Sequence, residues 1–471
     1  MPQPGSPTRI VIVGGGFGGV YTALHLQRIF RKAHAVYITL LDRDNYFLMT
    51  PLLFEAGSGV IEPRHAVTPI RTLLKKAQFV EADVERIDLD ARVVHARHSP
   101  AAKTYALQYD HLVLSLGGVT NTRLIPGSQH AMTFKTLADA IFLRNHIIDL
   151  FEQADVEADP DRKRKLLTFV IIGAGLVGIE LTGELTEFTS HLTRTYHNID
   201  ASELKFHLLE AGPKILPEME RELADYAGEV LKKRGVQILT GTPAKQIEPG
   251  KVHLPPPPPD KPPYEGATAN HTLEAYTIVL VAGVTPSPML ADLPLEKDKK
   301  GRIVVDGTMR CKTRPEIWAV GDCAHIPDPS GNPYPSLAQH ALREARVLAR
   351  NIATAIRTPN APLEPFVYQT LGMLASLGHY RGVGRVFKFK IKGFFAWWVW
   401  RTYYLFQMPR WDTRVRIALD WTESLFFRPD LTKVDLAPER EQERRNSPAG
   451  GLPSRASAPS LSEPATIRSV R

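Results

Sequence analysis

This sequence of 471 residues has little cysteine and few long apolar runs, and its first residues are not apolar. Its only cysteines are Cys311 and Cys323, which lack CxxC or CxxxxC spacing, so we expect neither a disulfide framework nor a dithiol redox centre. The first residues, MPQPGSPTR, contain no apolar stretch like that of a secretory signal. We therefore predict a protein that stays in the cytoplasm.

The most apolar window is KGFFAWWVWRTYYLF, residues 392–406. Its apolar run from Gly393 is about fourteen residues long and is interrupted by Arg401, whereas a membrane-spanning helix needs roughly 20 apolar residues. This shortfall argues against a spanning helix. Two interpretations remain, a buried core helix and a helix that lies on a bilayer.

The positive charge gathers around the same window. The whole chain carries a net charge of +8, which is compatible with nucleic acid or acidic lipid as a partner. Residues 379–428 hold ten Lys or Arg against three Asp or Glu, a net +7, together with five of the six tryptophans. Tryptophan and tyrosine favour the headgroup level of a bilayer, and basic residues are attracted to anionic lipid. We therefore predict that this segment docks on a membrane.

Two segments combine a short β-branched run, a glycine cluster and a helical pattern: RIVIVGGGFGGVYTALHL and, about 160 residues later, LLTFVIIGAGLVGIELTGEL. This order predicts strand, tight turn and helix, with bare backbone and a helix N-terminus facing a pyrophosphate. Two such units indicate two dinucleotide-binding domains. The glycines that we expect to bind cofactor are Gly14, Gly16 and Gly19 in the first unit, and Gly173, Gly175 and Gly178 in the second.

A carboxylate ends the second strand of each unit. Asp42 follows VYITLL and is placed to accept a hydrogen bond from a ribose 2′-hydroxyl. Glu210 ends KFHLLE, where it would repel a 2′-phosphate and so favour NAD(H) over NADP(H). The alternatives are a strand-turn-helix without ligand and, for Glu210, a solvated strand end.

In PEIWAVGDCAH a short strand ends at Gly321 and Asp322. It looks like the second flavin-binding motif of flavoproteins with two dinucleotide-binding domains, whose aspartate contacts the ribityl chain. With YFLMTPLLFEAGSG, LGGVTNTRLIPG, PSLAQHALREA and KGFFAWWVWR, the order of motifs resembles the type II (non-proton-pumping) NADH:quinone oxidoreductases from about Arg9 to about Arg428.

The resemblance implies an α/β fold with two Rossmann-like domains, similar to glutathione reductase, and a C-terminal membrane-docking region. We expect an FAD domain in two parts (1–125 and 285–365), an NADH domain (126–284), a docking region (366–430) and a disordered tail (437–471). The implied cofactor is non-covalent FAD, held in part by Phe17 of the first loop. The implied reaction is hydride transfer from NADH to FAD, then transfer of two electrons to a membrane quinone without proton pumping.

Three further site residues follow from the resemblance. Glu180 resembles a glutamate near the stacked nicotinamide and flavin, although in the first helical turn it could simply complement the helix dipole. Gln339 matches the AQxAxQ quinone-site pattern, whose second glutamine is replaced by Arg343; we interpret the neighbouring His340 as a surface or core histidine. Lys392 matches a lysine near the quinone headgroup, or is a lipid contact.

Other functions stay open at this level. A sulfide:quinone oxidoreductase shares the architecture but needs a redox cysteine pair beside the flavin, whereas Cys311 and Cys323 lie twelve residues apart. A membrane-docked redox sensor without turnover, or a flavoprotein that binds nucleic acid through its basic stretch, would hold the same nucleotides. We favour a peripheral enzyme on the cytoplasmic face of the cell membrane, with no nucleic-acid partner; the sequence allows a homodimer.

Overall fold

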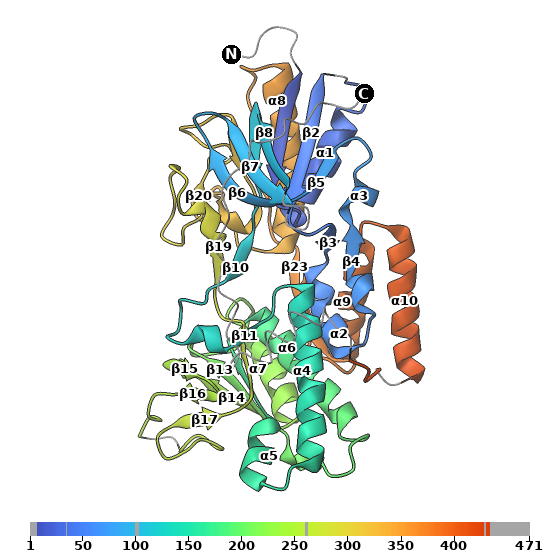
Figure 1. Cartoon of the computed structure of the whole chain (residues 1–471), viewed down its shortest axis with the longest axis vertical. Helices are drawn as coiled ribbons and strands as arrows, with labels where there is room; N and C mark the ends of the chain where they lie inside the picture. The colour runs from blue at the N-terminus through green and yellow to red at the C-terminus, as the bar shows by residue number, and fades with distance from the viewer. Residues whose placement is uncertain (1–6, 34, 99–102, 260–261, 428–429, 434–471) are drawn as a thin grey trace.

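The computed structural model describes residues 7–33, 35–98, 103–259, 262–427 and 430–433. Two five-stranded parallel sheets dominate the molecule, one in the upper half and one in the lower half of Figure 1. The predicted tail, residues 437–471, lies outside the described residues.

The first sheet has the order β21-β9-β1-β2-β5, and all its neighbouring strands are parallel. One of its strands, β21, follows in the chain only after all the strands of the second sheet. The first nucleotide-binding fold is therefore built from two separate parts of the chain. The strands are β1 (Thr8–Val13), β2 (Val36–Asp42), β5 (Gln78–Glu81), β9 (His111–Leu114) and β21 (Ile317–Ala319).

Helices α1 (Phe17–Ile29) and α8 (Ala338–Arg357) pack against each other beside this sheet. Smaller elements lie in the same two parts of the chain as this sheet. They are β3 (Tyr46–Leu48), α2 (Leu53–Ser58), β4 (Val67–Pro69), α3 (Ile70–Leu73), β6 (Asp83–Asp88), β7 (Val93–His98), β8 (Lys103–Gln108), β20 (Ile303–Val304) and β22 (Ala324–His325).

The second sheet has the order β11-β18-β12-β13-β14, again parallel throughout. Its strands are β11 (Met132–Thr133), β12 (Thr168–Ile172), β13 (Lys205–Glu210), β14 (Val236–Thr240) and β18 (Thr277–Leu280). Its helices are α4 (Leu137–Val156), α5 (Pro160–Leu166), α6 (Leu176–Leu192) and α7 (Arg221–Lys232). The α/β class with two dinucleotide-binding folds is therefore confirmed.

The two crossings between the sheets lie side by side, because β10 (Gly118–Thr120) pairs antiparallel with β19 (Val284–Pro286). They fall near the expected domain boundaries, which stay a prediction. The proline tract at 255–259 connects two antiparallel strands of the sheet formed by β15 (Gln246–Glu248), β16 (Lys251–His253) and β17 (Thr272–Glu274).

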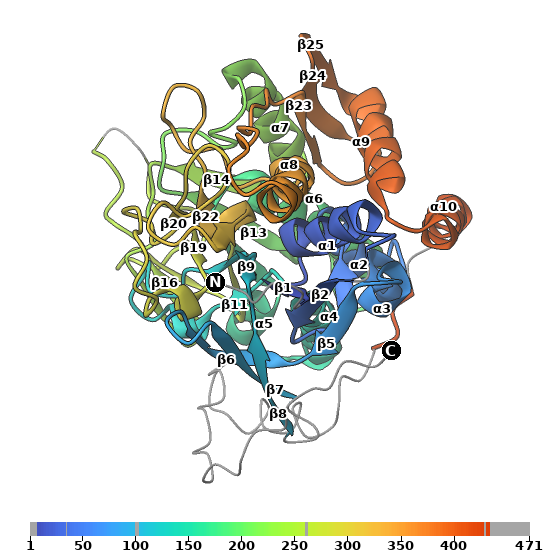
Figure 2. The same cartoon turned by 90° about the horizontal axis from the view of Figure 1, so that it is seen from above.

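The C-terminal region follows α8. It consists of the antiparallel sheet β23 (Gly372–Ser376), β24 (Gly382–Val386) and β25 (Phe389–Lys392), followed by α9 (Gly393–Gln407) and α10 (Trp411–Phe426). These elements lie together along one side of the molecule (Figure 2). Among the described residues, none of the helices combines the length and the apolar character needed to cross a bilayer.

Candidate active site

The two glycine loops share one backbone geometry. Gly14 has φ 105° and Gly173 has φ 109°, a region that L side chains rarely adopt. A Cβ on Gly19 would lie 1.8 Å from the carbonyl oxygen of Gly14, and one on Gly178 would lie 1.8 Å from that of Gly173. Gly19 and Gly178 are therefore required by close packing of each helix against its own loop, and Gly14 and Gly173 by their backbone conformation.

The middle glycine of each loop has a different reason. A Cβ on Gly16 would meet no heavy atom within 4 Å, and one on Gly175 would meet only Glu218 Oε1 at 3.9 Å. Packing within the chain therefore does not require glycine at either position. Each of them is the N-cap of its helix, α1 or α6, where open space and unpaired amides fit a pyrophosphate. Both loops thus fit a dinucleotide.

The two predicted ribose carboxylates lie against their loops. Asp42 accepts hydrogen bonds from the backbone N–H of Gly15 and, at 2.8 Å, of Asp44; burial raises the pKa of this carboxyl. Glu210 accepts from the backbone N–H of Ala174 at 2.8 Å and of Gly212 at 2.7 Å. Each carboxylate is thus oriented by the loop that it serves.

Asp322 lies at the carboxyl end of β21, two strands from β1 in the first sheet. The carboxyl ends of parallel strands share one edge, so Asp322 and the first glycine loop lie at the same edge. The preceding Gly321 has φ 75° and donates its N–H to Glu344 Oε2 at 2.9 Å. Lys135 Nζ lies 3.9 Å from the carboxylate of Asp322.

Both cysteines are buried and free. Burial raises the pKa of Cys311 and of Cys323 to about 12, so neither is a thiolate at neutral pH. The Cys323 thiol points to the carbonyl oxygen of Leu114 at 3.4 Å. A redox pair of the sulfide:quinone type therefore gains no support from the geometry.

A cavity of about 260 Å³ opens where the two loops meet the C-terminal region. Phe17, the first residue of α1, and Leu176, the first residue of α6, both line it. On the other sides lie Gln339 of α8 and Tyr404 of α9. At its edge, Phe387 is 64% exposed, which connects the cavity to the surface. The sequence-predicted Phe17 and Gln339 are therefore brought to one site.

Gln339 is held by two hydrogen bonds. Its Nε2 donates to the carbonyl oxygen of Gly372 at 3.0 Å, and the Tyr368 hydroxyl donates to its Oε1 at 3.2 Å. The next residue, His340, is buried and pairs with the Thr370 hydroxyl at 3.0 Å, which confirms a core histidine. Burial and then Arg343 lower the pKa of His340 to about 4, so its imidazole is neutral.

Glu180 begins the second turn of α6, since the helix starts at Leu176. The first-turn position expected from the sequence is therefore wrong. Its Oε1 accepts from the backbone N–H of Ser376 at 2.9 Å and from Trp400 Nε1 at 3.0 Å. Burial raises the pKa of Glu180 to about 8, against the opposing effect of these two bonds. A carboxylic acid near neutrality thus lies beside α9 and the cavity wall.

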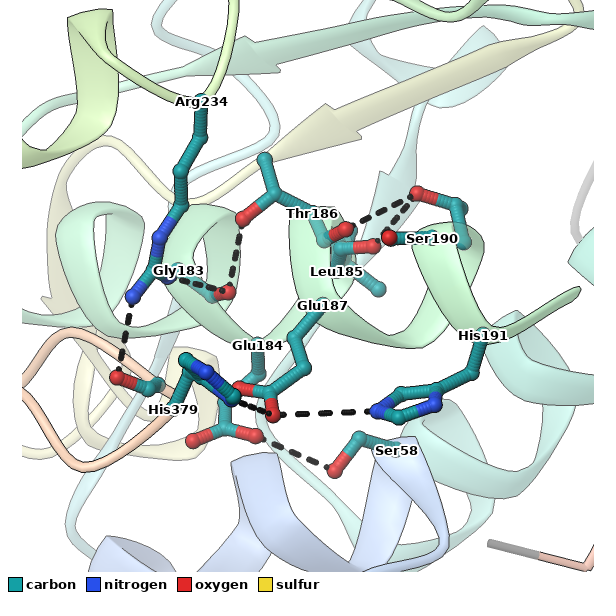
Figure 3. A network of polar contacts seen from close by, with 12 residues as sticks. Ser58, Gly183, Glu184, Leu185, Thr186, Glu187, Ser190, His191, Arg234 and His379 are labelled. Atoms are coloured by element: carbon teal, nitrogen blue, oxygen red, sulfur yellow. Dashed lines mark hydrogen bonds and ion pairs between the residues drawn. The ribbon is translucent and has the colours of Figure 1, made fainter. Parts of the chain in front are cut away.

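Two more acids follow on the same helix (Figure 3). Glu184 accepts from the Ser58 hydroxyl at 3.2 Å, and burial followed by Glu55 raises its pKa to about 8. Glu187 lies 2.9 Å from His379 Nδ1; although burial opposes it, hydrogen bonds from His191 and His379 lower its pKa to about 2. Sequence reasoning missed this group, although the spacing of positions 180, 184 and 187 places the acids on one helix face.

Lys392 differs from the expectation. Its Nζ lies 2.6 Å from Glu222 Oε1 and 5.7 Å from the centre of the Tyr226 ring, both on α7. It is not among the residues that line the cavity. The structure therefore does not bring Lys392 together with Gln339.

Helix α9 divides its aromatic residues between two environments. Trp397 and Trp400 are buried, whereas Phe395 and Trp398 are 57% and 50% exposed. Neither a pure core helix nor a helix lying entirely on a surface describes this arrangement.

The arginine that interrupts the apolar run has a structural partner. Arg401 Nη2 lies 2.8 Å from Glu55 Oε1, and Trp421 Nε1 donates to the other oxygen of that carboxylate at 2.6 Å. Glu55 is fully buried, and the Arg401 guanidinium lies between the rings of Trp397 and Trp421, 4.3 and 4.8 Å from their centres. This pair joins α9 and α10 to α2, and sequence reasoning missed it.

Known proteins match this chain along most of its length. The model for the pyridine nucleotide-disulphide oxidoreductases matches residues 8–345, and the model for the NDH2 C-terminal domain matches residues 370–430. The type II NADH:quinone oxidoreductase Ndh of Mycobacterium tuberculosis is 30% identical over 448 residues, 92% of each chain. That of Staphylococcus aureus is 32% identical over 390 residues, 82% of this chain and 91% of the relative.

Solved structures share the fold. The structure of NDH2 from Plasmodium falciparum in complex with NADH has a TM-score of 0.81 to this chain at 20% identity, covering 90% of this chain and 100% of that one. The similarity in sequence and in fold points to the same kind of protein as the two glycine loops, their carboxylates and the shared cavity. The chain therefore belongs to the type II NADH:quinone oxidoreductases.

Proposed function

We propose that this chain oxidises NADH through a non-covalently bound FAD and passes two electrons to a quinone that enters from a membrane surface. One observation carries the proposal: a single cavity is lined by the first helical residue after each glycine loop and by the C-terminal helix α9. A flavin at the first loop, a nicotinamide at the second and a quinone from the C-terminal side would converge there. When bound, FAD supplies the hydride acceptor for NADH and the electron donor for the quinone.

The chain's own residues position these groups. Gly16 and Gly175 leave room for two pyrophosphates, Asp42 and Asp322 would hold the flavin nucleotide, and Glu210 would hold the adenosine ribose of NADH. A carboxylate at this last position would repel the 2′-phosphate of NADPH. We expect Glu210→Gln to narrow the preference for NADH over NADPH, measured as the ratio of kcat/KM values. Equal use of both nucleotides by the unmodified enzyme would contradict this role.

The quinone end of the cavity needs hydrogen-bond donors, because each quinol gains two protons. Gln339 offers its side-chain amide at the cavity wall and is fixed by Tyr368 and Gly372. Glu180 holds a proton at neutral pH because burial raises its pKa to about 8. Its neighbour Tyr404 lines the cavity, and burial and then Glu180 raise the pKa of that hydroxyl. These groups supply polar atoms in an otherwise apolar site, where we expect the quinone oxygens to bind.

The test separates the two half-reactions. NADH added anaerobically should bleach the flavin, and a quinone added next should restore its absorbance. Gln339→Ala should leave flavin reduction by NADH intact and slow reoxidation by quinone, with the exposed Gln129→Ala as the matched control. Slowed reduction with unchanged reoxidation would place Gln339 at the nicotinamide and contradict the proposed site.

We place the enzyme peripherally on the cytoplasmic face of the cell membrane. Exposed apolar side chains are frequent on the C-terminal elements, which also line part of the cavity. They are Phe387, Phe389, Phe394, Phe395, Trp398, Phe406, Trp411, Leu419, Leu425 and Phe426. Such a group of aromatic residues suits the headgroup level of a bilayer, where the quinone is dissolved.

Charge supports this docking less than the sequence count suggests. Nine of the ten basic residues of 379–428 lie in the described part of the chain, and five of these nine form ion pairs within the protein. They are Arg385 with Glu220, Lys390 and Lys392 with Glu222, Arg401 with Glu55 and Arg410 with Asp412. We therefore expect aromatic burial to dominate, so that high salt weakens binding to anionic vesicles only in part.

Vesicle flotation tests the docking surface. Phe395→Ser/Trp398→Ser should lower the fraction that floats with vesicles and slow the reduction of a long-tailed quinone in the bilayer. The control is Val156→Ser on α4, which also removes an exposed apolar side chain. An unchanged floating fraction in the double variant would contradict this placement.

A further inference from the structure

Arg343 places a charged side chain in the wall of a mostly apolar cavity. It occupies the position where the AQxAxQ pattern has its second glutamine, and its side chain lines the cavity with Gln339. Its Nη1 donates to the Gln339 carbonyl oxygen at 2.8 Å, and its guanidinium carbon lies 4.5 Å from the centre of the Tyr368 ring. Both contacts fix the guanidinium close to the side chain that we assign to the quinone.

The charge of Arg343 is not balanced by an acid in the cavity. Among the described residues that line it none is acidic, and no ion pair of Arg343 with a carboxylate is found in the described part of the chain. The other cationic lining residue, Arg385, lies 3.5 Å from Glu220 and is 45% exposed. The neighbouring His340 is neutral, and Glu344 is turned to the backbone N–H of Gly321. Arg343 thus faces the cavity with its positive charge unpaired.

We propose that Arg343 makes this cavity select quinones and quinone analogues that carry negative charge on a ring oxygen, such as ionised hydroxyquinones. The inference rests on the proposed quinone site. A glutamine at this position would donate a hydrogen bond without charge, whereas a guanidinium donates several and is never deprotonated in proteins. It therefore stabilises an oxyanion strongly in an apolar site, and it does so without giving up a proton.

A matched pair of ligands tests the charge alone. The flavin-loaded enzyme is titrated at pH 7 and low salt with 2-hydroxy-1,4-naphthoquinone, which is ionised, and with 2-methoxy-1,4-naphthoquinone, which is neutral. Quenching of tryptophan fluorescence gives both dissociation constants. We expect the ionised ligand to bind about tenfold more tightly than the neutral one, the effect of one hydrogen bond to a charged group.

Three variants identify the source of this preference. Arg343→Gln restores the amide of the family pattern and should bring the two dissociation constants together, whereas Arg343→Lys should keep part of the preference. Arg385→Gln removes the cavity's other cation, which already has Glu220 as a partner, and should keep the full preference. An unchanged preference in Arg343→Gln, or its loss in Arg385→Gln, would overturn the proposal.

Separate readouts distinguish this inference from the proposed function. Flavin content and the urea midpoint of each variant show whether it folds. Reduction of the flavin by NADH in the same preparations tests the enzyme activity independently of the titrations. An enzyme whose flavin NADH does not reduce would refute the proposed function, while the ratio of dissociation constants would still decide the role of Arg343.

Discussion

The two glycine loops and helix α9 hold their functional groups by opposite means. In the loops, backbone contacts fix the shape. Gly14 and Gly173 adopt nearly the same φ, and Gly178 approaches Gly173 as closely as Gly19 approaches Gly14. In α9, side-chain contacts hold the helix in place. Trp400 donates to Glu180 inside the molecule, and Trp398, two positions earlier, is half exposed.

This difference shows where each region is vulnerable. A loop built on backbone contacts tolerates no added atom where the chain touches itself. A helix held by side chains tolerates substitution at its surface but depends on a few buried partners far away in the sequence. Loss of a backbone contact should therefore abolish cofactor binding, and loss of a side-chain partner should weaken attachment of the C-terminal region.

The largest effect is expected at Gly19. In Gly19→Ala the new Cβ would meet the carbonyl oxygen of Gly14 at 1.8 Å, so the first loop cannot keep its shape. We expect this variant to purify without flavin, measured as the ratio of absorbance at 450 nm to that at 280 nm. Gly16→Ala is the matched control, because its Cβ meets no protein atom within 4 Å. It should fold and bind FAD more weakly; a fully loaded Gly19→Ala protein would contradict the geometry.

The next effect concerns the buried pair of α9. Arg401→Met leaves the carboxylate of Glu55 buried without its cation, which typically costs about 3 to 5 kcal/mol. We expect a lower urea midpoint and earlier proteolytic cleavage after α8. The double variant Arg401→Met/Glu55→Gln removes both charges and should recover part of the loss. Arg416→Met, an exposed arginine of α10, is the control.

Distance along the chain explains what the sequence could predict. The glycine loops and their carboxylates use residues within a few tens of positions, so spacing alone located Asp42 and Glu210. The partners of α9 lie much farther away: Glu55 is 346 positions from Arg401, and Glu180 is 220 positions from Trp400. No local pattern carries that information. The family resemblance suggested that Lys392 lies near the quinone headgroup, with a lipid contact as the alternative, yet strand β25 turns it to α7.

A smaller effect should appear as a pH dependence. Burial raises the pKa of Glu180 to about 8 from 4.5, so the folded protein holds this proton where the unfolded chain has lost it. Its contribution to stability is full below about pH 4.5 and is lost as the pH rises through about 8. Glu180→Gln should therefore be more stable relative to the unmodified protein at pH 9 than at pH 5. The stability of Glu180→Gln should still fall as the pH rises, because Glu184 and Glu344 also have pKa values raised to about 8. Urea midpoints across this pH range measure it, and a difference that is constant with pH would contradict the burial argument.

The smallest effect is expected at Lys392. Lys392 and Arg401 are nine positions apart and each pairs with a distant glutamate, but Glu222 is exposed where Glu55 is fully buried. Solvent and salt screen the exposed pair, so Lys392→Ala should leave the urea midpoint unchanged. Because its Nζ reaches α7 and does not line the cavity, the rate of flavin reoxidation by quinone should also stay the same. The measurement is the stopped-flow reoxidation rate beside that of Gln339→Ala. If Lys392→Ala slowed reoxidation as Gln339→Ala does, while stability held, Lys392 would have to reach the quinone in the working enzyme, and the family resemblance would have located it better than this geometry does.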